Sequence, residues 1–271
     1  MPRKRRYASR RNRKTIVYKG PSGYVNNHPN PVVSIIIPAM NERATLADVL
    51  YQASRIHRCS ETIVVANGST DGTPEISAKL GARVITADKP LGHDVGRRVG
   101  AEAAKGQVLL FIDADMVIPA AELRPFVKAV LEGVDVALND YSGPTGGREV
   151  HTVVLAKHSL NAMLGRSDLK GASLTAVPHA ISRKAAAAIG FRTLEVPPVA
   201  LAAAVLRGFK VQAVHSVQVG RINPAKYRGR QGDPLTSLIA GDHLDALHWL
   251  IYERGSRGGY SDLGRQRDKV R

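Results

Sequence analysis

The segment that most constrains the fold runs from Gln107 to Pro119 and reads QVLLFIDADMVIP. Its five consecutive apolar residues, 108–112, lack the alternation of a half-exposed strand. They predict a strand that is buried on both faces, as in a parallel sheet. Asp113 and Asp115 follow directly. Both would therefore stand at the carboxyl end of the strand, where open α/β sheets bind ligands.

These two carboxylates have two interpretations. Unpaired aspartates are costly to bury, so a cation is a natural partner, and Mg²⁺ often links one or two carboxylates to substrate phosphates. The alternative is a turn at the end of a strand, with both acids in solvent. A D-x-D pattern is short and does not decide between the two by itself.

The amino-acid composition limits the classes of protein to which this chain can belong. The chain has 271 residues, of which 44% are hydrophobic and 23% charged, as is ordinary for a globular protein with one substantial core in one or two domains. It has no apolar run long enough to cross a bilayer and no signal-peptide pattern. Cys59 is the single cysteine, which rules out an intramolecular disulfide. We therefore expect a cytoplasmic protein.

The net charge of +16 is unevenly distributed. Residues 1–19 contain nine Lys or Arg and no acid, which leaves +7 for the rest of the chain. Such a segment is typical of a flexible, solvated tail, and it could also bring the protein to an anionic membrane as a peripheral protein. No aromatic interleaving or nucleic-acid motif accompanies it, so we expect no specific nucleic-acid partner.

Strands and helices alternate through the first half of the chain. The expected strands are 32–37, 61–66, 83–86 and 107–112, and the expected helices are one from Arg43, 74–80 and 94–105. This order predicts βαβ units and a mostly parallel central sheet flanked by helices, in an α/β domain. Right-handed crossovers would bring the loops at 38–42, 66–73 and 113–115 to one edge of the sheet, where they can form a nucleotide-sized site.

The second half is more irregular. The sequence predicts strands at 134–138 and 210–214, helices at 150–164 and 197–207, and an amphipathic helix at 241–251. The expected apolar face of this last helix consists of Leu244, Leu247, Leu250 and Ile251. We expect it to pack on the core, and we expect the basic ends of the chain to be flexible.

Four motifs together resemble the family 2 glycosyltransferases of the GT-A fold. They are residues 33–42 (VSIIIPAMNE), 63–73 (IVVANGSTDGT), 110–115 (LFIDAD) and 176–191, which contains AVPHAISRKAA and IGF. The resemblance covers about residues 32–220 and rests on the order and spacing of the motifs. It implies a basic tail and linker at 1–30, a GT-A domain at 31–220 with a nucleotide-sugar half (31–118) and an acceptor half (119–220), and a final part, 221–271, with a lid segment and the amphipathic helix.

The family implies an inverting transfer of a sugar from a nucleotide-diphospho-sugar to an acceptor hydroxyl, with Mg²⁺ or Mn²⁺ as the cofactor. In this resemblance Asp115 would ligate the metal on the diphosphate, and Asp113 would face the sugar or the ribose. A cation at this place offsets the charge that builds on the leaving diphosphate. The residues expected to bind the nucleotide-sugar are Pro38, Ala39, Asn41, Glu42, Asn67, Asp71, Gly92, Arg97, Asp113, Ala114 and Asp115.

Two of these positions come from the segment 90–98 (PLGHDVGRR), which is expected to contact phosphate or sugar. Gly92 permits a close approach of the backbone, and a helix N-terminus at Asp94 favours an anion. Arg97 or Arg98 could meet the diphosphate, although arginines that face solvent on a helix are commoner.

Two positions depart from the family pattern. The family usually has two aspartates where this chain has Ala66 and Asn67. A carboxylate that could accept from a base N–H is thus missing, so a GDP-sugar donor stays open beside the favoured UDP-sugar. The usual Glu-Asp pair near the acceptor is Glu195-Val196 here. Glu195 would then be the catalytic general base that deprotonates the acceptor hydroxyl, or else only a charge at the start of the following helix.

Further candidates lie in the acceptor half. Gly171, in the segment 171–178, and His179 are expected near the acceptor, although a lone histidine is more often structural. His215 follows the last strand, where many enzymes of the GT-A fold have a metal-binding histidine. Imidazole suits Mn²⁺ better than Mg²⁺, and a hydrogen-bonded histidine at a strand end is an equal alternative.

The segment 219–230 is basic and rich in turn-forming residues. It could close over the diphosphate as a lid, with Arg221 or Lys226 as the cationic contact. Closure would exclude water and so disfavour hydrolysis of the donor.

Two alternatives stay open, and a third is disfavoured. The first is transfer to a small phosphorylated acceptor, similar to glucosyl-3-phosphoglycerate synthases, which the basic surplus would suit as it would suit a lipid phosphate. Nucleotidyltransferases share the sheet plan, but residues 38–42 (PAMNE) are not their Gly-rich, basic loop. A protein that binds nucleic acid or a membrane through its basic ends would keep salt-sensitive binding after Asp115→Ala and lose it without residues 1–19. The motifs do not identify the sugar or the acceptor. They also leave the oligomeric state undetermined, and a homodimer is possible.

Overall fold

The computed structural model describes residues 25–146, 149–222 and 234–266. Within them, seven strands form one sheet in the order β3-β2-β1-β4-β6-β5-β7. The strands are β1 (Val33–Ala39), β2 (Ser60–Asn67), β3 (Arg83–Ala87), β4 (Val108–Phe111), β5 (Val136–Asn139), β6 (His179–Ser182) and β7 (Val211–His215). Only β6 runs antiparallel to its neighbours. The prediction of an α/β domain with a mostly parallel sheet is confirmed, whereas β6 was not predicted.

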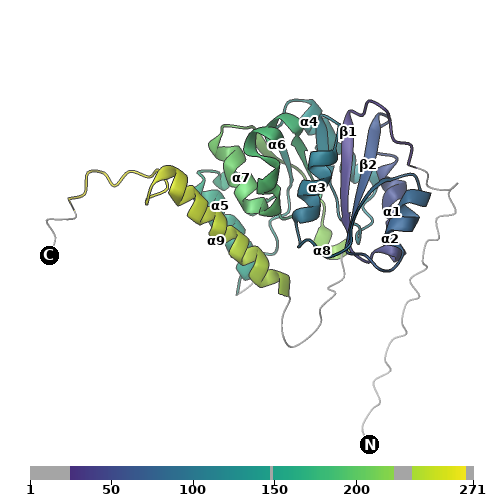
Figure 1. The fold of residues 1–271 in the computed structure, drawn as a ribbon. Helices are drawn as coiled ribbons and strands as arrows, with labels where there is room; N and C mark the ends of the chain where they lie inside the picture. Colours follow the sequence, from purple (N-terminus) through teal and green to yellow (C-terminus); the bar gives the residue numbers. More distant parts are fainter. Residues whose placement is uncertain (1–24, 147–148, 223–233, 267–271) are drawn as a thin grey trace, which may run out of the picture.

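Helices cover both faces of the sheet (Figure 1). They are α1 (Arg43–Ala53), α2 (Thr73–Lys79), α3 (Val95–Ala103), α4 (Ala120–Leu131), α5 (Thr152–Met163), α6 (Arg183–Ile189), α7 (Pro197–Leu206), α8 (Val219–Ile222) and α9 (Pro234–Arg254), with short 3₁₀ turns η1 (Ser167–Leu169) and η2 (Phe191–Glu195). Ile35 and Ile37 of β1 pack toward α1 and α4, and Ile36 packs toward α3. Because successive side chains of a strand point to opposite faces, an unbroken apolar run is what such a two-sided core requires.

The folded part of the chain begins earlier than predicted. Val25 is buried, and its N–H donates to the carbonyl of Leu80. The side chain of Asn27 accepts from the N–H of Thr62 and donates to the carbonyl of Gly81. Residues 25–30, which were predicted to belong to a linker, are thus packed on the domain. Residues 1–24, which contain the basic segment, lie outside the described residues.

Helix α3 lies close to the sheet because two of its residues are glycines. A Cβ on Gly100 would lie 2.4 Å from Cγ2 of Ile36, and one on Gly96 would lie 3.1 Å from Cβ of Pro38. Neither glycine favours a helix, but both allow this helix to approach β1. The first turn of α3 can therefore reach the carboxyl end of the sheet.

We expect Gly100→Ala to destabilise the protein although alanine is the better helix former. Alanine gains up to about 1 kcal/mol in helix propensity, whereas forcing a methyl group into a filled core typically costs about 1–3 kcal/mol. Urea unfolding should therefore give a lower midpoint. Gly241→Ala in α9 is the matched control, because a Cβ there meets no atom within 4 Å, and its midpoint should rise. A higher midpoint for Gly100→Ala would contradict the close packing of α3.

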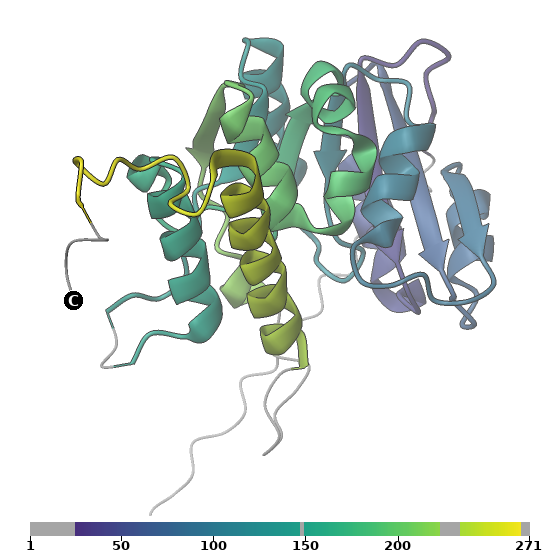
Figure 2. The same ribbon diagram turned by 60° about the vertical axis from the view of Figure 1, so that its left-hand side comes forward.

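The C-terminal helix is longer than predicted and buries a different face. Helix α9 packs beside α5 and α7 (Figure 2). The buried residues are His243, Ala246 and Leu250, whereas Leu244 is 66% exposed and Ile251 is also exposed. The predicted apolar face was therefore wrong in part, because the two neighbouring helices select the buried stripe. None of the helices in the described ranges combines the length and hydrophobicity needed to cross a bilayer.

Candidate active site

The carboxyl ends of the parallel strands and the beginning of β6 meet at one edge of the sheet. Strand β1 pairs in parallel with β2 and β4, and His179 at the start of β6 pairs with Phe111 at the end of β4. The hydroxyl of Thr45 in α1 donates to the carbonyl of Ala114, at 2.7 Å. The predicted convergence of the loops after β1, β2 and β4 is confirmed, and this edge is called the site edge below.

The loops after β1 and β2 are joined by hydrogen bonds. The N–H of Asn41 donates to the hydroxyl of Ser69 at 3.1 Å, and the Asn41 side chain accepts from the N–H of Thr70 at 2.8 Å. The N–H of Glu42 donates to the hydroxyl of Thr73 at 3.0 Å. Asn41 has a φ of +58°, a conformation that asparagine tolerates better than most residues. These two loops are therefore held as one unit.

Asp71 is part of the same network. Its two oxygens accept from the N–H of Arg43 at 3.0 Å, from the N–H of Thr73 at 3.0 Å and from the Thr73 hydroxyl at 2.5 Å. The Thr73 hydroxyl is the main reason why the pKa of Asp71 lies below its usual value. Asp71 thus orders the loop, and its contact with a ribose stays a prediction.

Asn67 joins the end of β2 to the loop after β3. Its amide donates to the carbonyl of Gly92 at 2.9 Å and accepts from the N–H of Leu91 at 2.6 Å, and the residue is only 7% exposed. An aspartate could accept from Leu91 but could not donate to Gly92. This arrangement gives a local reason for asparagine where the family usually has aspartate. Base recognition by Asn67 stays a prediction.

Arg97 lies inside the protein rather than facing solvent. Its guanidinium is 3.0 Å from Asp94 and 3.7 Å from Asp113, and it donates to the carbonyl of Leu174 at 3.2 Å. Arg97 is 6% exposed. One side chain therefore ties α3 to the end of β4 and to the segment before β6. The solvent-facing alternative is excluded for Arg97.

Negative charge accumulates around Asp113. Burial raises the pKa of Asp113, Arg97 opposes this shift, and the carboxylates of Asp115 and Asp94 add to it. The Arg97 guanidinium contacts two of these carboxylates, Asp94 and Asp113, and His93 also lowers the pKa of Asp113. A second cation at this corner would be electrostatically favourable.

The donor atoms at this corner fit a hard divalent cation. Asp113 and Asp115 are both half-buried and offer carboxylate oxygens, the ligand type that Mg²⁺ prefers. The described residues contain no group of three or more His, Cys, Asp or Glu side chains arranged around one metal position. A metal at this corner would therefore need oxygens from a bound diphosphate or from water as its other ligands.

His215 is engaged elsewhere. It ends β7, opposite Asn139 of β5, and its Nε2 lies 2.8 Å from the Glu122 carboxylate. Its ring also packs edge-on against Phe126 of α4. Metal binding through Nε2 would have to break the contact with Glu122, so the metal role stays a prediction.

Glu195, the candidate base, is bound to an arginine. It ends η2, and its carboxylate lies 2.5 Å from Nε of Arg98, which also contacts Glu102 at 3.2 Å. The two partners of this pair are partly exposed. A proton-accepting role for Glu195 stays a prediction, and an acceptor hydroxyl would have to compete with Arg98 for the carboxylate.

The two residues that were predicted to bind the acceptor are Gly171 and His179. They lie at opposite ends of the segment before β6. The N–H of Gly171 donates to the Ser142 hydroxyl at 3.1 Å. His179 is 2% exposed, its Nδ1–H donates to the carbonyl of Ala176, and its ring stacks on Phe111. Burial lowers the pKa of His179 to about 3, so the ring is neutral. His179 is thus placed to support the sheet edge, and acceptor contact by either residue stays a prediction.

One organising residue, Asn139, was not predicted from the sequence. It is fully buried, donates to the carbonyls of Val177 and Val217, and accepts from the N–H of Val217 at 2.8 Å. Asn139 therefore fastens the segment before β6 to the segment after β7. A polar residue that directly follows an apolar run at the same edge as Asp113 was the available signal.

The proposed lid is described only at its start. Arg221 is exposed in α8, and Lys226 lies outside the described residues. The closure of this segment over a diphosphate stays a prediction.

The fold and the site edge are those of an α/β protein that binds a ligand at the carboxyl ends of its strands. A pair of carboxylates and two joined loops lie at that edge. The chain belongs to glycosyl transferase family 2, whose family model matches residues 34–185. The predicted family is thereby confirmed.

Several characterised proteins are similar to this chain. It is 30% identical over 122 residues to an undecaprenyl-phosphate 4-deoxy-4-formamido-L-arabinose transferase of Aeromonas hydrophila, which covers 41% of this chain and 37% of that protein. It is 32% identical over 108 residues to a dolichyl-phosphate hexose transferase of Haloferax volcanii, with 40% and 47% covered. It is 29% identical over 138 residues to a glucosyl-3-phosphoglycerate synthase of Mycobacterium tuberculosis, with 46% and 42% covered. The matched segments span less than half the length of each relative.

Solved structures agree on the fold. A glucosyl-3-phosphoglycerate synthase from Mycobacterium tuberculosis, in complex with Mn²⁺, uridine-diphosphate and phosphoglyceric acid, superposes with a TM-score of 0.60 at 24% identity, over 86% of this chain and 81% of that chain. A further mycobacterial protein gives 0.59 at 19% identity, with 86% and 77% covered. At 24% and 19% identity, the structural similarity shows the fold alone. The predicted GT-A fold is thereby confirmed.

Proposed function

We propose that this protein is a metal-dependent enzyme that transfers a sugar from a nucleotide-diphospho-sugar to a hydroxyl group of a phosphorylated acceptor. The observation that carries the proposal is the corner at Asp113 and Asp115, which lies beside the joined loops after β1 and β2 in a chain of this family. A UDP-sugar is the favoured donor, with a GDP-sugar as the alternative. The complex of the similar synthase with Mn²⁺ and uridine-diphosphate supports this choice.

The donor would lie across the site edge. Its nucleoside would contact the loops that contain Asn41 and Asp71, and its diphosphate would lie at Asp115. Hydrogen bonds between protein groups hold these two loops together. Such preorganisation lowers the cost of ordering the site on binding.

Asp115, with Asp113 beside it, would hold Mg²⁺ or Mn²⁺ together with the diphosphate. The bound ion would offset the negative charge of the leaving diphosphate. Arg97 keeps Asp113 in place by contacting it from α3. His215 would be a second protein ligand of the metal, once its contact with the Glu122 carboxylate is broken.

Glu195 is proposed as the general base of an inverting transfer. An inverting reaction needs a group that accepts the proton of the attacking hydroxyl. The anomeric configuration of the product, read by NMR coupling constants, tests this role. A product that retains the configuration of the donor would remove the need for Glu195 as base.

A phosphorylated acceptor is supported by two observations. The chain has a net charge of +16, which favours anionic partners. The names of three similar proteins contain undecaprenyl-phosphate, dolichyl-phosphate and phosphoglycerate. A lipid-phosphate acceptor would differ in one respect, because a polyprenyl phosphate has no separate hydroxyl and would accept the sugar on a phosphate oxygen. Such an acceptor would bring this enzyme to a membrane surface, for which the basic residues 1–19 are suited.

A thermal-shift panel of nucleoside diphosphates and nucleotide-sugars, with and without Mn²⁺, tests the donor site. Ligand at a hundred times its dissociation constant stabilises a protein by about 2.7 kcal/mol. We expect a rise of several degrees that needs both UDP and Mn²⁺. A rise with GDP instead would change the base that is recognised. If no nucleotide stabilises the folded protein, the proposed function is wrong.

A further inference from the structure

Two consecutive arginines of α3 contact two different carboxylates. Arg97 reaches Asp113 after β4, with 3.7 Å between its Nη2 and Oδ1 of the aspartate. Arg98 reaches Glu195 at the end of η2, with 2.5 Å between its Nε and Oε1 of the glutamate. The 3₁₀ turn η2 packs along α3. One helix therefore holds both the carboxylate next to the candidate metal corner and the candidate base.

The Arg98 guanidinium lies between two acids. Its Nη1 donates to both oxygens of Glu102, each at 3.2 Å, one turn further along α3. Its Nε is buried, and the N–H is not aligned with Glu195 for a hydrogen bond, so that contact is an ion pair. Burial alone would lower the pKa of Arg98, but Glu102 and Glu195 together raise it above its usual value. Arg98 is therefore a fixed positive charge whose direction Glu102 helps to set.

One oxygen of Glu195 is left open by this contact. Arg98 meets Oε1, and Oε2 has no ion pair or hydrogen bond within the described ranges. The Glu195 side chain is 26% exposed. Helix α7 begins two residues later, at Pro197, and contributes no charged side chain of its own. An acceptor hydroxyl can therefore approach Oε2, and its competition with Arg98 is limited to Oε1.

We propose that Arg98 is the positioning residue of the general base: it holds the Glu195 carboxylate through Oε1 while Oε2 accepts the proton of the acceptor hydroxyl. This inference rests on the proposed function and specifies how the same site orients its base. In the transfer, the proton moves to Oε2, the hydroxyl oxygen bonds to the anomeric carbon, and the diphosphate leaves with the electron pair of the broken bond. A positive charge beside a carboxylate favours its ionised form, which is the form that accepts a proton.

The alternative role for Arg98 is a contact with the diphosphate of the donor. Two of its nitrogens, Nε and Nη1, already face protein carboxylates, which favours base positioning. The two roles differ in the kinetics that they predict. Loss of a diphosphate contact would weaken donor binding, whereas loss of base positioning would slow the transfer step and leave donor binding unchanged.

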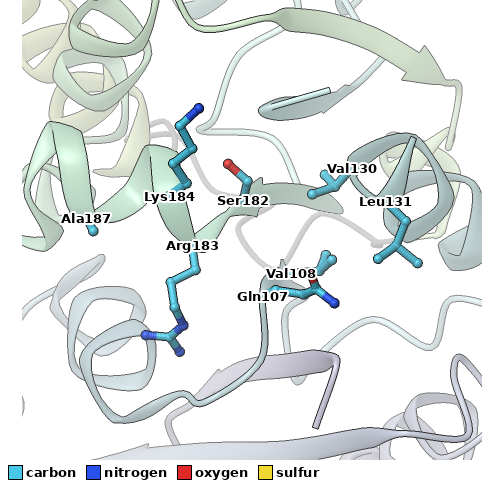
Figure 3. A pocket seen from close by; sticks show the side chains of 8 residues that line it. All are labelled: Gln107, Val108, Val130, Leu131, Ser182, Arg183, Lys184 and Ala187. Carbon is cyan, nitrogen blue, oxygen red and sulfur yellow. The ribbon is translucent and has the colours of Figure 1, made fainter. Parts of the chain in front are cut away.

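A control position is available at the opposite end of the sheet. Lys184 lines a pocket of about 470 Å³ where β4 begins and β6 ends (Figure 3). This lysine is exposed, and no ion pair joins it to an acid in the described part of the chain. Arg183 of the same pocket donates to the carbonyls of Gly106 and Ala104. Lys184→Met therefore removes one positive charge without changing the site edge.

Kinetics and donor binding together test the role of Arg98. Transfer is measured as UDP release from UDP-glucose with Mn²⁺ and phosphoglyceric acid, whose hydroxyl must lose a proton. Donor binding is measured as the thermal shift with UDP and Mn²⁺. We expect Arg98→Met to lower kcat at least about tenfold with unchanged UDP binding. Arg98→Lys, which keeps the charge, should recover part of kcat, and Lys184→Met should match the wild type. Weaker UDP binding with unchanged kcat would overturn the inference and assign Arg98 to the diphosphate.

A double variant separates positioning from a general structural role. Glu195→Gln removes the base and should lower kcat about a hundredfold or more. If Arg98 acts through Glu195, adding Arg98→Met to Glu195→Gln should change kcat by less than about twofold, because the two losses are not additive. An equal loss from Arg98→Met in both backgrounds, or wild-type kcat for Glu195→Gln, would overturn the inference.

A second acceptor separates this inference from the proposed function. A polyprenyl phosphate in phosphatidylcholine vesicles would accept the sugar on a phosphate oxygen that is already ionised at neutral pH, so its transfer needs no base. Transfer to the polyprenyl phosphate alone, at a rate that Arg98→Met does not change, would overturn the inference and leave the proposed sugar transfer in place. If the wild type binds no nucleotide and transfers sugar to neither acceptor, the proposed function itself is wrong.

Discussion

Asp115→Asn is expected to abolish sugar transfer and to leave the fold intact. The amide keeps the shape of the side chain but is a neutral and weaker ligand for a divalent cation. Stabilisation of the leaving diphosphate is worth several kcal/mol, and about 1.4 kcal/mol corresponds to a factor of ten in rate. We therefore expect kcat/KM to fall at least about a thousandfold, measured as UDP release with the donor that the thermal-shift panel identifies.

The control for this variant is Asp48→Asn. Asp48 is an exposed aspartate on α1, and its replacement changes the net charge equally. It should keep full activity. Circular dichroism should show the same fold for both variants. Transfer by Asp115→Asn at the wild-type rate would refute the assignment of this residue to the metal.

Arg97→Met is expected to cause the largest loss of stability. The substitution fills similar space but leaves Asp94 and Asp113 without the guanidinium that contacts both. Breaking a buried ion pair by removing one partner costs about 3–5 kcal/mol. Urea unfolding at neutral pH should show this loss. Mn²⁺ should restore part of it, because a cation bound near Asp113 would replace the missing positive charge.

Arg98→Met is the matched control, since Arg98 is the next residue on the same helix. Its guanidinium is partly exposed and contacts Glu102 and Glu195. Exposed ion pairs contribute about 0–1 kcal/mol, so a small loss is expected. Equal losses for the two variants would mean that Arg97 is not the buried link that joins α3 to β4. A lack of any Mn²⁺ effect on Arg97→Met would argue against a cation near Asp113.

The arrangement of the site edge could be predicted because it follows from local patterns. Residues 108–112 are apolar without alternation, and a sheet covered on both faces requires such a run. Asp113 and Asp115 then stand at the carboxyl end, beside the loops that end β1 and β2. Parallel pairing and right-handed crossovers leave few other arrangements.

The bonding partners at the site could not be predicted. Asn67 binds the backbone at Gly92, and Arg97 binds the carbonyl of Leu174. Both contacts join segments that are far apart in the sequence, so no local pattern reveals them. Without them, Asn67 was interpreted as a base-binding residue, and Arg97 as a side chain that could meet the diphosphate or else face solvent.

Elements that depend on tertiary contacts were also missed. Strand β6 has four residues and lies between β4 and β5 in antiparallel orientation. Four residues offer no periodicity that distinguishes a strand from a loop. The buried stripe of α9 is likewise set by α5 and α7, since Leu244 is as apolar as Leu250 but faces solvent.

The place of β6 in the sheet has a consequence for synthesis on the ribosome. Strand β4 pairs with β1 on one side, and its other side is completed only by β6, which is made much later. Until then the nascent chain carries an apolar strand with an open edge, and such edges pair readily with other chains. A chain that terminates before His179 would keep this edge exposed. Protein quality control, rather than loss of a site residue, would then decide the fate of such a fragment.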